Sequence, residues 1–223
     1  ISCGMEITTD TVWKNPSAQR HFVYKINKKF KNIRKSLVFS IKNSHNISNI
    51  QGKRVIPMEI HCSPEVSEEY LDEVREILRN KEFLSLCQYC HHQRSNRLLH
   101  SLNVSYFSWK IARRLGCDVR AAARAGLLHD FCPYDFSEET PTGERQVFYH
   151  PKAAAKNSSR YFELSQKECD AILTHMFPLG PVPTNREGVI ISIADKVCAV
   201  LEVCNVAVAL ARRGRVVVVS AAA

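Results

Sequence analysis

The sequence contains no apolar run that approaches the roughly 18 to 20 residues needed to cross a bilayer. Its first thirty residues carry five lysines and arginines where a secretion signal would have an apolar core. These absences argue against an integral membrane protein and against a secreted one. We therefore expect a soluble, cytoplasmic protein with no membrane partner.

Cysteine is not scarce, but the nine cysteines are an odd number and no secretion signal accompanies them, so reduced thiols are expected. Cys87, Cys90 and His91 have the Cys-x-x-Cys-His spacing of covalent haem attachment, which normally follows export. No second cysteine pair follows at zinc-ligand spacing. The cysteines thus give no strong indication of haem or of structural zinc.

The chain has 223 residues and 45% hydrophobic content, enough to bury one full core with an extension. Its net charge of +9 is unevenly placed. Residues 1–60 hold 11 lysines and arginines against 3 acidic residues, whereas residues 61–223 hold 20 against 19. Residues 1–60 also lack a sustained hydrophobic period, which predicts a weakly ordered basic extension before a domain over 61–212 and a tail over 213–223.

Three interpretations of the basic extension stay open. It could be an arm that binds nucleic acid or another acidic surface. It could be a solvated tail. Because the organised pattern begins just after Met58, the preceding residues could also be an upstream extension of the reading frame.

Beyond the extension the pattern is almost entirely helical and predicts an all-α fold, a helical bundle. Pro64 suits the first position of a helix, after which apolar residues recur at spacings of four, four and three. Further helices are expected over 81–91, over 98–115 ended by Gly116, over 118–129 capped by Asp118, from Pro151, from the capping box of Ser165 and Glu168, and over 187–212.

Two segments are less regular. Residues 131–148 contain two prolines and a glycine and are expected to form a long loop, of the kind that often covers a site. The terminal run 216–219 is compatible with a short strand or with a tail.

Histidine and aspartate recur through the helical region, at predicted helix ends or beside apolar residues. The six are His100, His129, Asp130, His150, His175 and Asp195. Imidazole nitrogen and carboxylate oxygen suit iron, manganese, zinc or a similar divalent ion, and Asp130 could bridge two ions. Singly, each has a simpler explanation as a core or surface histidine or a capping aspartate. Jointly they favour a metal site, because Asp195 interrupts the apolar run 189–200, where an unpaired carboxylate would be costly.

The arrangement resembles the HD superfamily of metal-dependent phosphohydrolases, whose motif is a His, a His-Asp pair and a distal Asp on separate helices. The matching segments are Arg97-Leu-Leu-His100, Ala125-Gly-Leu-Leu-His129-Asp130 and Ile193-Ala-Asp195. The resemblance covers about residues 66–205 and implies that these four ligands bind a first metal ion. His150 and His175 resemble additional histidines of small bacterial two-metal members related to symmetric diadenosine tetraphosphate hydrolases. One difference is the segment Phe131-Cys-Pro-Tyr-Asp-Phe136, where many members have a basic continuation.

The resemblance implies hydrolysis of a phosphate ester or anhydride in a small phosphorylated substrate, a nucleotide, by a hydroxide activated on two divalent ions such as iron or manganese. Asp130 would orient that hydroxide. Arg97 lies one helical turn before His100 and Lys196 follows Asp195, so either could contact a phosphate oxygen. The alternatives are a structural ion pair for Arg97 and a solvated surface position for Lys196.

Two other functions stay open. A mononuclear nucleotidase would use only His100, His129, Asp130 and Asp195, and its other two histidines would bind substrate phosphate. A non-catalytic nucleotide-sensing or RNA-binding module would use the basic extension to reach nucleic acid.

Overall fold

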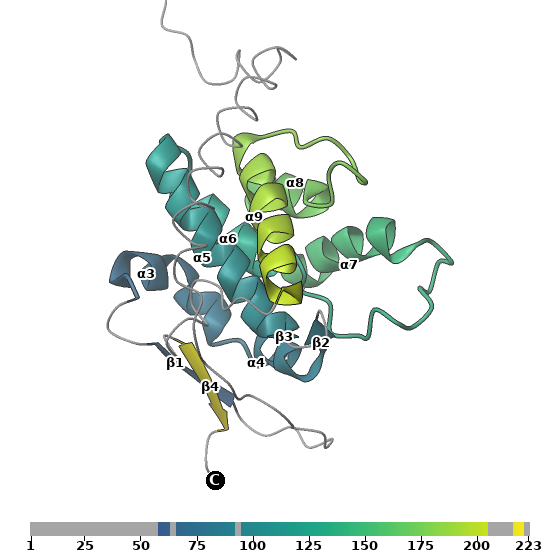
Figure 1. Cartoon of the computed structure of the whole chain (residues 1–223), viewed down its shortest axis with the longest axis horizontal. Helices are drawn as coiled ribbons and strands as arrows, with labels where there is room; N and C mark the ends of the chain where they lie inside the picture. The colour runs from purple at the N-terminus through teal and green to yellow at the C-terminus, as the bar shows by residue number, and fades with distance from the viewer. Residues whose placement is uncertain (1–57, 63–65, 92–94, 205–215, 221–223) are drawn as a thin grey trace, which may run out of the picture. The chain divides into compact units, whose positions relative to one another are not determined.

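The computed structural model describes residues 58–62, 66–91, 95–204 and 216–220. The chain divides into two units, 1–53 and 54–223, and all the described residues belong to the second. In this part of the chain the fold is all-α, as predicted, with two short antiparallel strand pairs beside the helices (Figure 1). The predicted weak order of residues 1–57 and the helical pattern of 205–212 lie outside the described residues.

The first strand pair joins residues far apart in sequence. Strand β1 (Met58–Cys62) pairs with β4 (Val216–Ser220), with Met58 opposite Ser220. Residues 58–60, expected to lack regular structure, therefore begin a strand. The terminal valine run is a strand rather than a tail, in keeping with the preference of β-branched residues for extended backbone.

Helix α3 (Glu68–Leu78) begins four residues later than predicted from Pro64. Its N-cap is Ser67, and two glutamates in its first turn favour this start because they oppose the positive end of the helix dipole. The apolar stripe is confirmed, since Tyr70, Val74 and Ile77 are fully buried.

The single helix predicted over 81–91 is wrong. Helix α4 (Lys81–Leu84) is followed by a 3-10 turn, η1 (Ser85–Gln88), and by strand β2 (Cys90–His91), which pairs with β3 (Ser95–Asn96). The hydroxyl of Ser85 donates to the carbonyl of Glu82 at 2.6 Å. Such local side-chain bonds compete with a continued α-helix, which is the physical reason for the early end.

Helix α5 (Arg97–Leu115) ends where predicted, and helix α6 (Val119–Leu128) begins where predicted. Gly116 ends α5 in the left-handed conformation with φ of 62°, and the Asp118 side chain caps α6. The two helices pack closely. A Cβ atom on Gly126 would lie 3.0 Å from the Cα of Ser105, so glycine permits this backbone approach.

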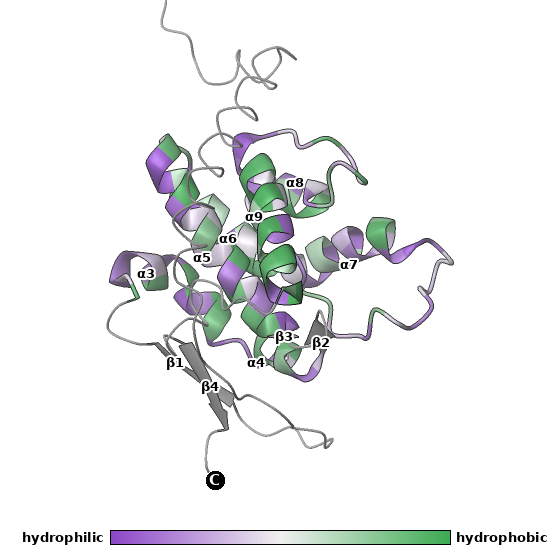
Figure 2. Cartoon of the chain, in the orientation of Figure 1, coloured by the Kyte–Doolittle hydropathy of each residue, from purple (hydrophilic) through white to green (hydrophobic). Residues whose placement is uncertain are grey.

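The remaining helices are α7 (Gln146–Tyr161), α8 (Gln166–Thr174) and α9 (Arg186–Val203). Pro151 was expected to start α7 but lies inside it, so the loop before α7 is shorter than predicted. The predicted capping box at the start of α8 is confirmed, and Asn185 caps α9. Figure 2 shows the contrast between the largely hydrophobic α9 and the hydrophilic α3. None of the helices in the described ranges combines the length and apolar character that a membrane crossing requires.

A buried arginine links α6 to α3 and α8. Arg124, only 3% exposed, donates from Nε to Glu168 at 2.7 Å and from Nη1 to Glu76 at 2.9 Å. Its third nitrogen donates to the carbonyl of Glu163 at 3.0 Å. Because Glu168 also closes the capping box of α8, one carboxylate fixes both the start of that helix and its distance from α6.

The α5–α6 contact gives a stability prediction. Gly126→Ala should lower the free energy of unfolding, measured by urea denaturation, by up to about 2 kcal/mol, because overpacking against backbone costs about 1 to 3 kcal/mol. The gain in helix propensity from glycine to alanine, about 1 kcal/mol, offsets only part of this loss. An unchanged or raised stability would show that the two helices can separate without cost.

Candidate metal centre

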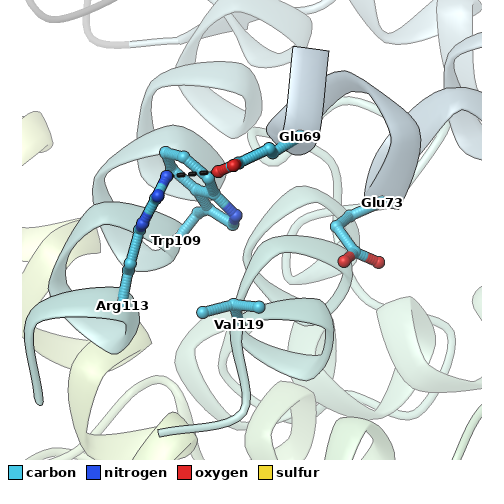
Figure 3. A pocket seen from close by; sticks show the side chains of 5 residues that line it. All are labelled: Glu69, Glu73, Trp109, Arg113 and Val119. Carbon is cyan, nitrogen blue, oxygen red and sulfur yellow. Dashed lines mark hydrogen bonds and ion pairs between the residues drawn. The ribbon is translucent and has the colours of Figure 1, made fainter. Parts of the chain in front are cut away.

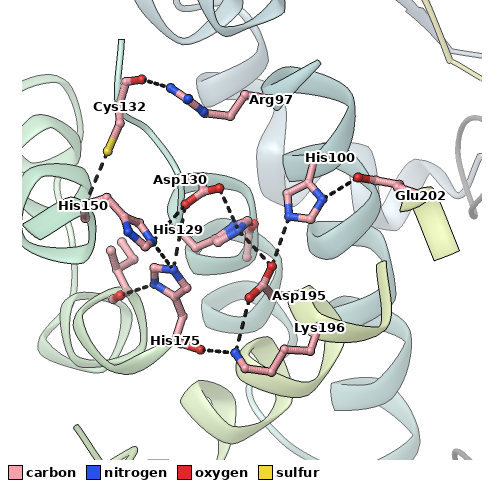
Figure 4. Close-up of polar contacts among 12 residues, drawn as sticks. Arg97, His100, His129, Asp130, Cys132, His150, His175, Asp195, Lys196 and Glu202 are labelled. Atoms are coloured by element: carbon pink, nitrogen blue, oxygen red, sulfur yellow. Dashed lines mark hydrogen bonds and ion pairs between the residues drawn. The ribbon is translucent and has the colours of Figure 1, made fainter. Parts of the chain in front are cut away.

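The structure brings the six predicted ligand residues together from five helices (Figure 4). His100 lies in the first turn of α5, and His150 and Asp195 lie within α7 and α9. His129 and His175 are the C-cap residues of α6 and α8, and Asp130 follows the first of these. Five of the six are buried, and the side chain of Asp195 is 14% exposed. Helix ends therefore direct three of the ligand groups into the interior.

One group of ligand atoms gathers around His129. Its Nε2 lies 3.6 Å from Asp130 Oδ2 and 3.8 Å from Asp195 Oδ1. The same Asp195 oxygen lies 3.1 Å from His100 Nε2. His100, His129 and Asp130 also offer ligand atoms within 4.8 Å of one another.

A second group forms on the other side of Asp130. The Nε2 atoms of His150 and His175 are 2.9 Å apart, and they lie 3.5 and 3.8 Å from Asp130 Oδ1. Asp130 therefore directs one carboxylate oxygen to each group. This is the placement expected of a carboxylate that bridges two ions.

The protonation of three imidazoles follows from their backbone contacts. The Nδ1 atoms of His129, His150 and His175 lie 2.9, 2.7 and 2.7 Å from the carbonyl oxygens of Gly126, Gln146 and Ile172. A carbonyl oxygen only accepts, so each neutral ring carries its proton on Nδ1 and a lone pair on Nε2. The 2.9 Å contact between His150 and His175 then joins two lone pairs and is no hydrogen bond. Among the described residues, buried His129 Nε2 likewise has no hydrogen-bond partner.

Burial and neighbouring charge lower the pKa values of four ligand groups, those of His129, Asp130, His175 and Asp195. Burial lowers the pKa of His129, and burial together with the nearby His129 and His150 lowers that of His175 to about 3. Burial alone would raise the pKa of Asp130 and Asp195. The surrounding imidazoles, and for Asp195 the hydrogen bond from His100, outweigh it and hold both carboxyl pKa values below their usual range.

His100 behaves differently from the other histidines. Burial opposes its charged form, but hydrogen bonds to Asp195 and Glu202 outweigh burial and raise its pKa to about 10. A divalent cation between these side chains would take the place of that proton. The donor set of imidazole nitrogens and carboxylate oxygens suits iron, manganese or zinc, so the residues present fit the predicted metal ions.

Arg97 contacts the loop that follows Asp130. Its guanidinium donates to the carbonyl oxygens of Cys132 and Tyr134, the latter at 2.8 Å, and lies 3.7 Å from the ring centre of Phe136. These partners are backbone carbonyls, so the alternative of a structural ion pair is not what the structure shows. The phosphate contact predicted for Arg97 stays a prediction, and its geometry favours a role in holding the loop.

Side chains from other segments donate hydrogen bonds to four successive carbonyl groups of the loop after Asp130. Besides the two bonds from Arg97, Asn157 donates to the carbonyl of Phe131 at 3.1 Å and Tyr89 donates to that of Pro133 at 2.8 Å. The Phe136 ring then lies 5.1 Å from the ring of His150. Side chains from α5, from α7 and from the segment before α5 thus position the loop, and with it the Phe136 ring beside the ligand His150.

Lys196 lies at the edge of the ligand cluster. Its ammonium donates to the carbonyl of His175 at 2.9 Å and contacts Asp195 Oδ2 at 3.4 Å, while 39% of the side chain is exposed. Lys196 is therefore partly exposed at the surface, and the phosphate contact predicted for it stays a prediction. The Lys196 side chain is in contact both with solvent and with the ligand cluster.

Glu202 was missed by the sequence interpretation. It is buried near the end of α9 and accepts from His100 Nδ1 at 2.9 Å. A signal was available, because a residue seven positions after Asp195 lies on the same face of the helix. This glutamate matches no motif.

A surface pocket elsewhere in the described part is unrelated to the ligand cluster. It is lined by Glu69, Glu73, Trp109, Arg113 and Val119 (Figure 3). Glu69 pairs with Arg113, and Glu73 pairs with Arg120 at 3.1 Å. Both acidic side chains are thereby engaged within the protein.

Comparison with known proteins agrees with the ligand geometry. Residues 97–200 match the HD domain family. All six ligand residues lie within these matched residues, which are 104 of the chain's 223 and show a likeness to the HD superfamily of metal-dependent phosphohydrolases. No solved structure matches the chain significantly.

Curated relatives match a smaller part. Ribonuclease Y from three strains of Clostridium perfringens is 40% identical over 68 residues, which are 28% of this chain. The matched part spans only 13% of the length of those relatives. The likeness to symmetric diadenosine tetraphosphate hydrolases stays a prediction.

The loop contacts predict a local effect of Arg97. Arg97→Gln should speed amide exchange in residues 131–136 by about 10 to 100 fold, since hydrogen bonds from a charged donor are worth about 1.5 to 3 kcal/mol. Hydrogen-exchange mass spectrometry measures this, with α3 as the internal control. Tyr89→Phe, which loses only the bond to Pro133, should have a smaller effect. Unchanged exchange in the loop after Arg97→Gln would contradict the assigned role.

Proposed function

We propose that the HD domain is a metal-dependent phosphohydrolase that uses two divalent ions to cleave a phosphate ester or anhydride of a nucleotide. The observation that carries this proposal is the convergence of three imidazole lone pairs, fixed by backbone carbonyls, on the two oxygens of Asp130. Without a cation, 2.9 Å between two such nitrogens is a repulsive contact.

The ligands divide into two sets that share Asp130. One ion would be held by His100, His129, Asp130 and Asp195, and the other by Asp130, His150 and His175. Bound ions supply a water of lowered pKa and positive charge that neutralises the phosphate oxygens.

The protein's own groups have distinct tasks in this proposal. Asp130, facing both ligand sets, accepts a hydrogen bond from the attacking water and so orients it. The partly exposed ammonium of Lys196 donates to a phosphate oxygen. Arg97 acts by positioning the loop 131–136, and the organic part of the substrate meets that loop at Phe136.

Metal content separates this proposal from a mononuclear nucleotidase. After dialysis against Mn²⁺, elemental analysis should find two ions per chain, and one ion per chain for His175→Ala. His129→Ala should abolish hydrolysis across a panel of nucleotides, dinucleoside polyphosphates and cyclic nucleotides. One ion per chain in the unaltered protein, with activity that survives replacement of His150 and His175, would favour the mononuclear enzyme. Metal binding without hydrolysis of any panel member would favour a sensing module.

A second candidate substrate is single-stranded RNA. The similarity to Ribonuclease Y supports it, and so does the outer face of α7, where Phe148, Lys152, Lys156 and Arg160 recur at spacings of four and are exposed. Helix α7 contains no acidic residue, whereas α3 contains five. The same helix supplies His150 from its buried side.

A charge-matched pair of variants tests the RNA candidate. Replacing Lys152, Lys156 and Arg160 by Gln should weaken binding of a fluorescent single-stranded oligonucleotide and lower the slope of log Kd against log salt by about 2. The control replaces exposed Arg79, Lys81 and Arg114 by Gln. Both variants keep the N-terminal extension, and EDTA removes any contribution of metal. Equal binding by the two variants would exclude the α7 face as the RNA surface.

A further inference from the structure

His100 differs from the other ligand histidines in what its Nδ1 contacts. The other three rings donate to backbone carbonyls, whereas His100 Nδ1 lies 2.9 Å from Glu202 Oε2. Its Nε2 faces Asp195 at 3.1 Å. A carboxylate therefore performs for His100 the task that the backbone performs elsewhere in the cluster.

Glu202 is placed for this contact by two helices. It is 9% exposed, lies two turns after Asp195 on α9, and has its other oxygen 3.5 Å from the side-chain nitrogen of Asn103. Asn103 follows His100 by three residues on α5, so it lies on the same helix face. A buried carboxylate is costly unless paired, and here its partners include the imidazole proposed to hold the metal.

We propose that Glu202 is a positioning residue of the metal centre: it accepts a hydrogen bond from His100 Nδ1–H and thereby leaves the Nε2 lone pair of that ring to face the metal position beside Asp195. This inference rests on the proposed function, since it concerns how one ligand of that site is prepared. Figure 4 shows Glu202 and Asp195 on opposite sides of the His100 ring, each joined to one of its nitrogens. Such partners fix ring orientation and tautomer and strengthen the bond to the metal.

Three variants separate hydrogen-bond geometry from charge. Glu202→Gln keeps an oxygen acceptor at the same reach but loses the charge, whereas Glu202→Asp keeps the charge and withdraws the acceptor by one methylene group. Glu202→Ala removes both. Glu187→Gln is the matched control, because Glu187 is a buried glutamate at the opposite end of α9 whose oxygen accepts from the backbone of Asp118 at 2.9 Å.

The measurement is Mn²⁺ affinity of the full chain by isothermal titration calorimetry. Glu202→Ala should bind one ion about 10 to 100 fold more weakly. Glu202→Gln should remain closer to the unaltered protein than Glu202→Asp, and Glu187→Gln should be unchanged. The opposite order of Gln and Asp, or unchanged affinity in Glu202→Ala, would overturn the positioning role. If Glu202→Ala does not fold, the Gln and Asp pair still decides.

A spectroscopic readout separates positioning from a merely structural contact. In the Zn²⁺-loaded protein, ¹⁵N correlation spectra of the histidine rings should show His100 protonated at Nδ1 and metal-bound at Nε2. Glu202→Asp should shift or broaden these signals and leave those of His175 unchanged. An unaltered His100 signal would contradict the inference alone, whereas failure of the unaltered protein to bind any divalent ion would contradict the proposed function.

Discussion

The arrangement of the site depends on backbone carbonyls that hold the Nδ1 protons of buried histidines. Gly126, Gln146 and Ile172 each lie three or four residues before the histidine that they contact, so the end or first turns of each helix supply the acceptor. Because the protons are fixed there, the Nε2 lone pairs must face one another in the interior. Such a cluster is stable only when cations or protons lie between the rings, and this constraint links the fold to a metal centre.

The surrounding structure keeps these helix ends in place. Close packing at Gly126 sets the separation of α5 from α6, and Arg124 connects α6 to α3 and α8. The loop after Asp130 has no regular structure of its own to satisfy its carbonyls, and side chains of neighbouring segments bond four of them in succession. Stability and site geometry therefore share the same contacts, with Glu202 extending this support to His100.

Much of the fold could be predicted from the sequence because caps and periodicity are local, whereas the grouping of the site was predicted from the joint His and Asp pattern and its resemblance to the HD superfamily. Asp118, Gly116 and the capping box at Ser165 act within one turn, and all three end or begin helices where expected. The start of α3, the early end of α4 and the position of Pro151 inside α7 depend on competing local bonds and tertiary packing that periodicity does not record. Glu202 and the task of Arg97 were missed for a related reason. Each acts on groups distant in sequence, and neither the glutamate nor the four loop carbonyls form a motif.

In the proposed site, cations lie between the imidazole lone pairs around Asp130. Anomalous diffraction from crystals grown with Mn²⁺ tests it most directly. Two anomalous peaks are expected, one among His100, His129 and Asp195 and one between His150 and His175, both next to a carboxylate oxygen of Asp130. Saturating Mn²⁺ with no peak in contact with these nitrogens would contradict it.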